Sequence, residues 1–130
     1  MLVDLTQGFI QADLPKGGKT IYITPPQGWE EDPDMVYEVK KPLYGMPHSG
    51  RCLHKTWSQW LKSEGFETVG YEKSMWVKKD GDQQIMLCTH VDDSFVTASS
   101  EAALINFRNR MLSAYGGRFD GTADMDAKNM

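Results

Sequence analysis

The stretch from Gln84 to Thr97 constrains the fold of this chain more than any other. It runs Gln-Ile-Met-Leu-Cys-Thr-His-Val-Asp-Asp-Ser-Phe-Val-Thr, so an apolar segment leads into Asp92 and Asp93 and a second apolar segment follows at once. This pattern predicts a strand, a tight turn and a second strand, with both carboxylates at or near the turn. An Asp-Asp pair alone is more often a solvated turn than a site. If it is half of a metal site, the rest of the chain has to supply the other half.

Composition sets limits on the class of protein. The chain has 130 residues, of which 40% are hydrophobic and 25% charged, which is typical of one folded domain with a modest core. No apolar run approaches the roughly 18 residues of a membrane span, and no signal peptide pattern is present, so we expect an intracellular protein, cytoplasmic or nuclear. The net charge of −4 disfavours a surface that binds nucleic acid without specificity. Cys52 and Cys88 have no metal-ligand spacing, and we expect both to be buried free thiols.

The N-terminal residues offer a candidate for the missing half. Residues 2–5 predict a short strand that contains Asp4, and residues 6–14 predict a short helix that Pro15 and the glycines after it end. A strand that ends in an acid and runs into a helix presents free backbone N–H groups beside that acid, which suits a phosphate if a divalent cation shields the carboxylate. Taken alone, Asp4 is more often a helix cap or a solvated strand end.

Periodicity predicts the other elements. Ser49 and Gly65 are the expected N-cap and terminator of the clearest helix, whose Trp57 and Trp60 we assign to the core, while residues 66–74 show no pattern. The elements are strands at 21–24, 35–39 and 75–78, a turn at 79–82, a helix at 51–64, and a last helix that Ser99 and Ser100 cap and that runs to about residue 114.

This order, β-α-β-β-α-β-β-α, predicts an α+β fold in which helices pack on one face of an antiparallel sheet. We expect one domain over residues 1–117 and an irregular, truncated tail over 118–130, which is rich in Gly and Asp. If the N-terminal strand lies beside the 84–97 hairpin, the carboxylates of Asp4, Asp92 and Asp93 converge and repel one another unless a cation is present. Hard oxygen ligands suit Mg²⁺, and two such ions support phosphoryl transfer.

Five segments of the chain together resemble the reverse transcriptases of copia-type retrotransposons. That family carries Met-Asp-Val-Lys-Thr-Ala-Phe-Leu-Asn-Gly-Asp-Leu, then Ile-Tyr-Met and Pro-x-Gly-Phe, then Leu-Lys-Lys-Ser-Leu-Tyr-Gly-Leu-Lys-Gln-Ala-Pro-Arg, a Gly-Phe after a helix, and a Tyr-Val-Asp-Asp box. The corresponding segments here are Val3–Leu14, Ile21–Ile23 with Pro26–Trp29, Val39–Arg51, Gly65–Phe66 and His90–Asp93. Each match is weak alone, but they run collinear over about residues 2 to 115.

The resemblance implies the palm of a polymerase right hand with part of the fingers. The implied reaction is RNA-directed DNA synthesis within a retrotransposon polyprotein, by deoxynucleotidyl transfer with two Mg²⁺ ions, or Mn²⁺ in their place. Asp4 and Asp92 would be the main catalytic metal ligands, with Asp93 in support. The implied partners are an RNA or DNA template-primer and deoxynucleoside triphosphates, with no membrane and an unspecified oligomeric state.

The resemblance also assigns residues to the nucleotide. Gln7 and Gly8 would offer backbone N–H groups to the incoming triphosphate. Phe9 would occupy the aromatic gate position that excludes a ribose 2′-OH. Tyr44 and Gly45 would line the nucleotide and template side.

Two alternatives stay open. A degenerate, non-catalytic retroelement remnant would keep the fold without the activity, and the replacement of the box tyrosine by His90 favours it. A carboxylate metal-dependent phosphohydrolase would use the acids but would give no role to Phe9 or to the Leu43–Gly45 loop. Because only part of the family's hand is matched, it is open whether the chain is an enzyme by itself, and we expect the isolated chain to be inactive.

Overall fold

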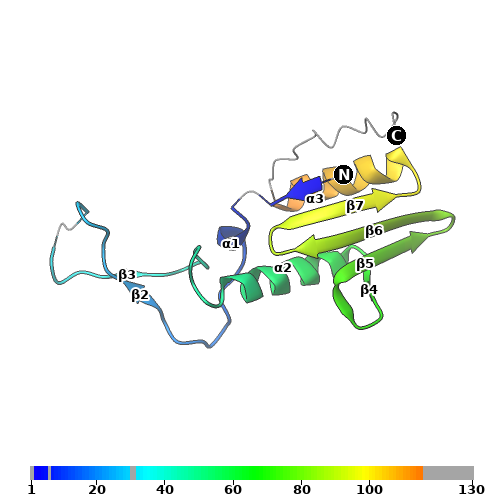
Figure 1. The fold of residues 1–130 in the computed structure, drawn as a ribbon. Coiled ribbons are helices and arrows are strands. Elements are labelled where there is room, and N and C mark those ends of the chain that lie inside the picture. The colour runs from blue at the N-terminus through cyan, green and yellow to red at the C-terminus, as the bar shows by residue number, and fades with distance from the viewer. Residues whose placement is uncertain (1, 6, 30–31, 116–130) are drawn as a thin grey trace.

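The computed structural model describes residues 2–5, 7–29 and 32–115 (Figure 1), so the predicted tail at 118–130 lies outside the described residues. Ten elements follow one another along the chain. They are β1 (Leu2–Asp4), α1 (Gly8–Gln11), β2 (Tyr22–Ile23), β3 (Tyr37–Glu38), α2 (Ser49–Ser63), β4 (Glu67–Val69), β5 (Glu72–Asp80), β6 (Gln83–His90), β7 (Asp93–Ala98) and α3 (Glu101–Tyr115). None of the helices in the described ranges is long and apolar enough to cross a membrane.

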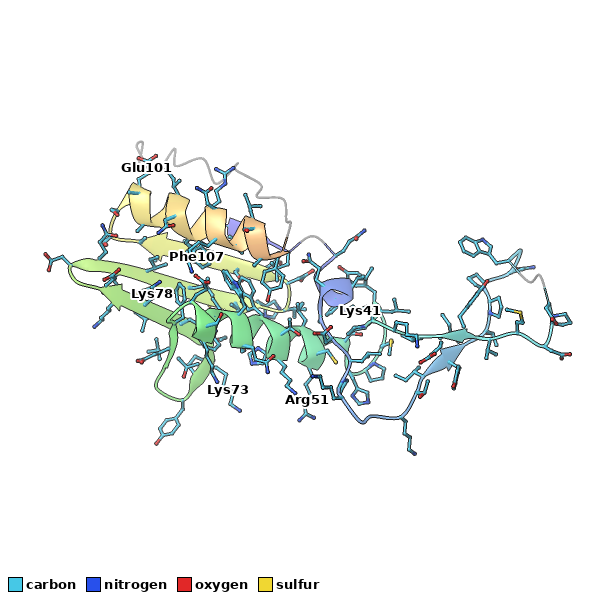
Figure 2. The ribbon with its side chains drawn as sticks, turned by 180° about the vertical axis from the view of Figure 1, so that it is seen from behind. Lys41, Arg51, Lys73, Lys78, Glu101 and Phe107 are labelled. Atoms are coloured by element: carbon cyan, nitrogen blue, oxygen red, sulfur yellow. The ribbon has the colours of Figure 1, made fainter. Side chains whose placement is uncertain are left out.

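The main sheet has five strands in the order β1-β7-β6-β5-β4, and every neighbouring pair is antiparallel. Figure 2 shows α2 and α3 across the same face of this sheet. The alternation along β7 explains this arrangement, because Ser94 and Val96 are buried while Asp93, Phe95 and Thr97 are exposed. The predicted α+β fold with helices on one face is therefore confirmed.

The core lies between the sheet and the two long helices. Its centre is aromatic: the rings of Trp57 and Trp60 stack with centroids 5.1 Å apart, and Tyr115 meets the Trp57 ring edge-on at 5.3 Å. Phe107 of α3 contacts the Phe66 ring with centroids 5.5 Å apart. Aromatic side chains bury a large area each, so this cluster fixes α2 and α3 relative to each other. The assignment of Trp57 and Trp60 to the core is confirmed.

Helix α2 ends as the sequence predicts. Gly65 has φ +87°, and its N–H donates to the Lys62 carbonyl at 3.0 Å while the Phe66 N–H donates to the Leu61 carbonyl at 2.9 Å. These two bonds satisfy helix-end carbonyls in the Schellman arrangement, which requires a left-handed residue that glycine adopts without strain. Next to this end, two nitrogens of Arg110 from α3 donate to the Glu64 carboxylate, and these hydrogen bonds lower the pKa of Glu64.

The structure corrects two of the predicted elements. The helix expected over residues 6–14 is a single turn, because Ala12 has an extended backbone with φ −76° and ψ 164°. Residues 67–69, expected to be irregular, form β4 by pairing with β5. All three residues of β4 are exposed, so no alternation of apolar and polar side chains marks this strand in the sequence.

Two predicted side-chain roles are also wrong. Ser49 is the first residue of α2 and not its N-cap; its hydroxyl donates to the Leu43 carbonyl, and His48 holds the N-cap position without a side-chain bond. Cys52 is buried as expected, but Cys88 is exposed. Cys88 pairs with Phe95 at an outward position of β6, on the face that the helices leave open.

Strands β2 and β3, which fall within the strands predicted at 21–24 and 35–39, form a separate two-stranded antiparallel sheet. We call residues 21–39 the arm. Figure 1 shows its ribbon projecting away from the main sheet and its helices. At its base the Val39 N–H donates to the Ile21 carbonyl at 2.8 Å, and Val39 is its one buried residue among those described.

The end of α2 allows a matched test of backbone conformation. We expect Gly65→Ala to lower the free energy of unfolding by about 1 kcal/mol, because alanine is strained at positive φ. Gly50→Ala is the control: Gly50 lies in α2 at ordinary φ with open space around its Cα, so the same change should raise stability by about 0.5–1 kcal/mol. Urea unfolding followed by circular dichroism measures both. Equal effects of the two changes would contradict the assigned helix end.

A second prediction concerns Tyr115. Burial raises its pKa to about 12, and its hydroxyl donates to the Thr56 carbonyl at 3.4 Å. The unfolded chain loses this proton near pH 10, so the folded state holds more protons between pH 10 and 12 and stability should fall as pH rises through that window. Tyr115→Phe should remove this part of the pH dependence, whereas Tyr71→Phe, at a fully exposed residue, should not. Unfolding free energies at several alkaline pH values provide the comparison.

Candidate metal and nucleotide site

The two acids of the opening motif lie at the turn between β6 and β7. His90 pairs with Asp93, which leaves Val91 and Asp92 as the two residues of the turn. Asp92 is half-buried and Asp93 is exposed at the start of β7. The predicted hairpin with both carboxylates at or next to the turn is therefore confirmed.

The turn holds an unusual backbone. Two-residue hairpin turns of the types that fit strand twist need positive φ at their first central residue, where Gly, Asn or Asp is usual. Here that residue is Val91, with φ +55°. A β-branched residue is an outlier in this region, and such strain persists only where neighbouring contacts hold it. The chain thus accepts a strained residue directly before Asp92.

Strand β1 lies against this hairpin. Its register with β7 sets Leu2 opposite Phe95 and Asp4 opposite Asp93, and the Leu5 N–H donates to the Asp92 carbonyl at 3.0 Å. The condition set in the sequence analysis, that the N-terminal strand lies beside the hairpin, is thus met at the level of the backbone. Because Asp93 also pairs with His90, these residues and Asp4 occupy one cross-strand row on the face that the helices leave open.

The donor chemistry of this row suits a hard divalent cation. Directly opposite residues of antiparallel strands are about 4.5–5.5 Å apart at Cα, so carboxylates at such positions repel unless a cation lies between them. Carboxylate oxygens are the ligands that Mg²⁺ prefers. Among the side chains that the structure describes, no group of three or more potential ligands forms a metal centre, and the Asp4 side chain lies outside that set. The convergence of all three carboxylates on one ion stays a prediction.

Gly8 brings α1 close to the turn. A Cβ atom at Gly8 would lie 3.2 Å from Leu53 Cδ2 and 3.5 Å from Asp92 Cβ, so only a residue without a side chain fits here without displacement. Its backbone N–H donates to the Leu5 carbonyl at 3.0 Å. The absence of a side chain at Gly8 permits close packing beside Asp92. The expected role of the Gly8 N–H as a donor to a triphosphate stays a prediction. Gln7, before it, has φ +53°.

The loop that precedes α2 packs against the same helical turn. The rings of Phe9 and Tyr44 meet edge-to-face with centroids 4.6 Å apart, and Tyr44 remains largely exposed. Gly45 follows with φ +85° and open space around it. Three of the residues assigned to the nucleotide, Phe9, Tyr44 and Gly45, thus lie together, and no described contact joins them directly to the carboxylates.

An exposed ion pair, which the sequence analysis did not predict, joins this loop to the segment that follows α1. Lys41 Nζ lies 2.6 Å from Asp13 Oδ1, and the hydrogen bond and charge of Lys41 lower the pKa of that carboxyl. The Asp13 N–H also meets Thr56 Oγ1 of α2 at 3.5 Å. Asp13 and Lys41 belong to different irregular segments, so no periodic pattern connects them, and only the opposite signs of their charges hinted at the pair.

Comparison with known proteins places this geometry in context. A family model described as reverse transcriptase (RNA-dependent DNA polymerase) matches residues 2–123. The chain is 24% identical over 106 residues to the retrovirus-related Pol polyprotein from transposon RE1 of Arabidopsis thaliana, and 25% identical over 119 residues to that from transposon RE2 of the same plant. It is 23% identical over 124 residues to a putative transposon Ty5-1 protein of Saccharomyces cerevisiae. No solved structure gave a significant match.

The matches cover most of this chain but little of its relatives. They span 80%, 90% and 94% of the chain, and 7%, 8% and 39% of the RE1, RE2 and Ty5-1 proteins respectively.

The strain at Val91 leads to a prediction. We expect Val91→Gly to raise the free energy of unfolding by up to about 1 kcal/mol, because relief of the positive φ outweighs the entropy that glycine loses on folding. Val69→Gly is the control, since Val69 is similarly exposed (40% against 51%) but has ordinary φ, and this change should destabilise. Thermal and urea unfolding give the comparison. Destabilisation by both changes to the same extent would show that Val91 stores no strain.

Proposed function

This chain belongs to the reverse transcriptase (RNA-dependent DNA polymerase) family, and on that premise we propose that it supplies the carboxylate-bearing part of a polymerase palm, with part of the fingers, for RNA-directed DNA synthesis. The observation that supports this proposal most is the pairing of β1 with β7, which sets Asp4 opposite Asp93 and bonds Leu5 to Asp92. Its relatives are named as Pol polyproteins of transposons, and we propose the same kind of setting for this chain.

Asp92, Asp93 and Asp4 are the residues that would hold divalent cations. Reverse transcriptases generally use a divalent metal; we propose Mg²⁺ here, with Mn²⁺ as a substitute, because the donors are carboxylate oxygens. When bound, a pair of such ions supplies Lewis-acid activation of an attacking hydroxyl and charge stabilisation on the transferred phosphate. The carboxylates themselves would position the ions at the turn between β6 and β7, for a template-primer and a deoxynucleoside triphosphate.

The neighbouring aromatic pair would select the sugar. We assign to Phe9 the exclusion of a ribose 2′-OH, and to Tyr44 and Gly45 the lining of the nucleotide site. The edge-to-face contact with Tyr44 holds the Phe9 ring, and the Lys41–Asp13 pair fastens the loop that carries Tyr44. Gln7 and Gly8 remain candidate backbone donors to the triphosphate, and the lack of a side chain at Gly8 allows α1 to approach Asp92.

The alternatives differ in their support. No observation favours a carboxylate phosphohydrolase, in which the Phe9–Tyr44 contact would serve no purpose. A non-catalytic remnant has one specific point in its favour, the replacement of the family's box tyrosine by His90, which is exposed in the cross-strand row beside Asp93. A neutral imidazole can still donate or accept a hydrogen bond there, so this replacement keeps a polar group at the position.

Metal titration tests the carboxylate assignment directly. We expect the chain to bind Mn²⁺ weakly, and Asp92→Asn to lower the affinity about tenfold, which is about 1.4 kcal/mol. Asp4→Ala should have an effect of similar size, because both residues serve one site. Asp82→Asn, in the turn between β5 and β6, removes an equal charge elsewhere and should leave the affinity unchanged. Affinity that is unaltered in Asp4→Ala would show that the paired strands do not share an ion.

Primer extension with the same Asp92→Asn variant separates catalysis from ancestry. The assay uses a DNA primer on an RNA template with Mg²⁺ and deoxynucleoside triphosphates. Incorporation that depends on Asp92 supports the polymerase proposal, and equal incorporation by both proteins rules out the catalytic assignment. We expect no incorporation by the isolated chain. If metal binding is intact, that outcome means that the chain either acts only as part of a larger polymerase or is a remnant.

A further inference from the structure

The arm exposes far more apolar surface than its length warrants. Of the 14 large apolar residues that are well exposed in the described part of the chain, six lie between residues 22 and 37. They are Tyr22, Ile23, Trp29, Met35, Val36 and Tyr37. Trp29 is the most exposed of the four tryptophans, at 68%, whereas Trp57 and Trp76 are at most 2% exposed. Exposed large apolar side chains gathered on one short segment mark an interaction site more often than apolar residues scattered singly over a surface.

The body of the protein does not use this surface. No residue of the arm belongs to the core cluster of the described residues, which draws on β1, α1, α2, α3 and the main sheet. The small sheet of the arm contains only β2 and β3 in the described ranges, and each strand has two residues. A two-stranded ribbon is marginally stable alone and gains stability from a further strand. Each of its strands has one neighbour, so an edge is available for pairing.

The charge of the arm identifies the class of partner. Residues 21–39 contain five acids, Glu30, Glu31, Asp32, Asp34 and Glu38, and no Lys, Arg or His. Exposed Tyr and Trp side chains can stack on nucleic-acid bases, but proteins that do so line the site with basic residues that neutralise phosphates. Here phosphates would meet like charge. The same rings and acids favour a polypeptide with Lys or Arg, through cation–π contacts and ion pairs.

We propose that the arm is a docking site for a basic, aliphatic polypeptide strand, which adds to the edge of the β2–β3 sheet. Register supports this mode of binding. Ile23 pairs with Tyr37 and Tyr22 pairs with Glu38, so one face of the ribbon is apolar and the other carries an acid. Lys40 Nζ already lies 2.6 Å from Glu38 Oε2, so Asp32 and Asp34 are the described acids left to pair with a basic partner. A strand that alternates aliphatic and basic side chains matches both faces. This proposal stands apart from the metal site and does not require polymerase activity.

Peptide binding to the intact chain tests the proposal. The probe is a fluorescent 12-residue peptide that alternates Lys and Val, compared with a Glu–Val peptide of the same length and with a 12-nucleotide single strand of thymidylate. A Lys–Val peptide with N-methylated valines tests for strand pairing, because N-methylation removes backbone donors. We expect the Lys–Val peptide to bind at least about tenfold more tightly than each of the three comparison probes.

Matched variants locate the binding. Trp29→Ala and Tyr37→Ala should each weaken binding of the Lys–Val peptide about tenfold, whereas Tyr71→Ala, at the fully exposed tyrosine before β5, should not. The double change Asp32→Asn with Asp34→Asn should weaken it several-fold, and Asp80→Asn with Asp82→Asn should not. The arm is absent from the core, so these variants should keep the melting temperature of the parent.

Three results would overturn the proposal. They are failure of the Lys–Val peptide to bind, binding that Trp29→Ala and Tyr37→Ala leave unchanged, and tighter binding of the thymidylate strand that depends on Trp29. The last of these would instead identify the arm as a nucleic-acid platform.

Discussion

The pairing of β1 with β7 is the contact on which the candidate site depends. It adds a short edge strand to a hairpin that is otherwise complete, and it sets Asp4 opposite Asp93. The Leu5 N–H then donates to the carbonyl of Asp92, so the turn is bound from outside as well as by its own strands. Helix α1 follows directly, and Phe9 on it contacts Tyr44. The position of the loop before α2 is therefore linked through α1 to the same edge strand.

The sheet places His90 and Asp93 on its open side. Both long helices pack on one face and bury inward residues of the central strands, such as Trp76, Leu87 and Val96. The outward face keeps Asp93 and His90 in one row and Leu2 and Phe95 in the next, all exposed. The helices that stabilise the fold thus leave the polar chemistry accessible.

Strong local signals made much of this fold predictable. The two-residue turn and the alternation around it determined the register of β6 and β7, and the apolar stripe with Gly65 determined α2. The errors arose where tertiary contacts decide. Strand β4 exists because β5 pairs with it, and Cys88 is exposed because no helix covers its face. For the site, the sequence patterns did not establish that Asp4 lies beside the hairpin. The roles of the site residues came from the family resemblance. The strain at Val91 and the Lys41–Asp13 pair carry no pattern that sequence could reveal.

The long separation between β1 and β7 bears on the order in which the molecule assembles. The strands β4 to β7 form a meander with short turns, so their pairing costs little loop-closure entropy and can occur early. Residues 2–4 have to close a loop that contains the arm, α2 and strands β4 to β6 before they meet residues 93–95. Each doubling of loop length adds only about 0.6 kcal/mol, but the contact forms after the elements it encloses. Asp4 is therefore expected to come opposite Asp93 late in folding, and an intermediate that lacks β1 keeps most of the core while its acidic turn remains without the opposing strand.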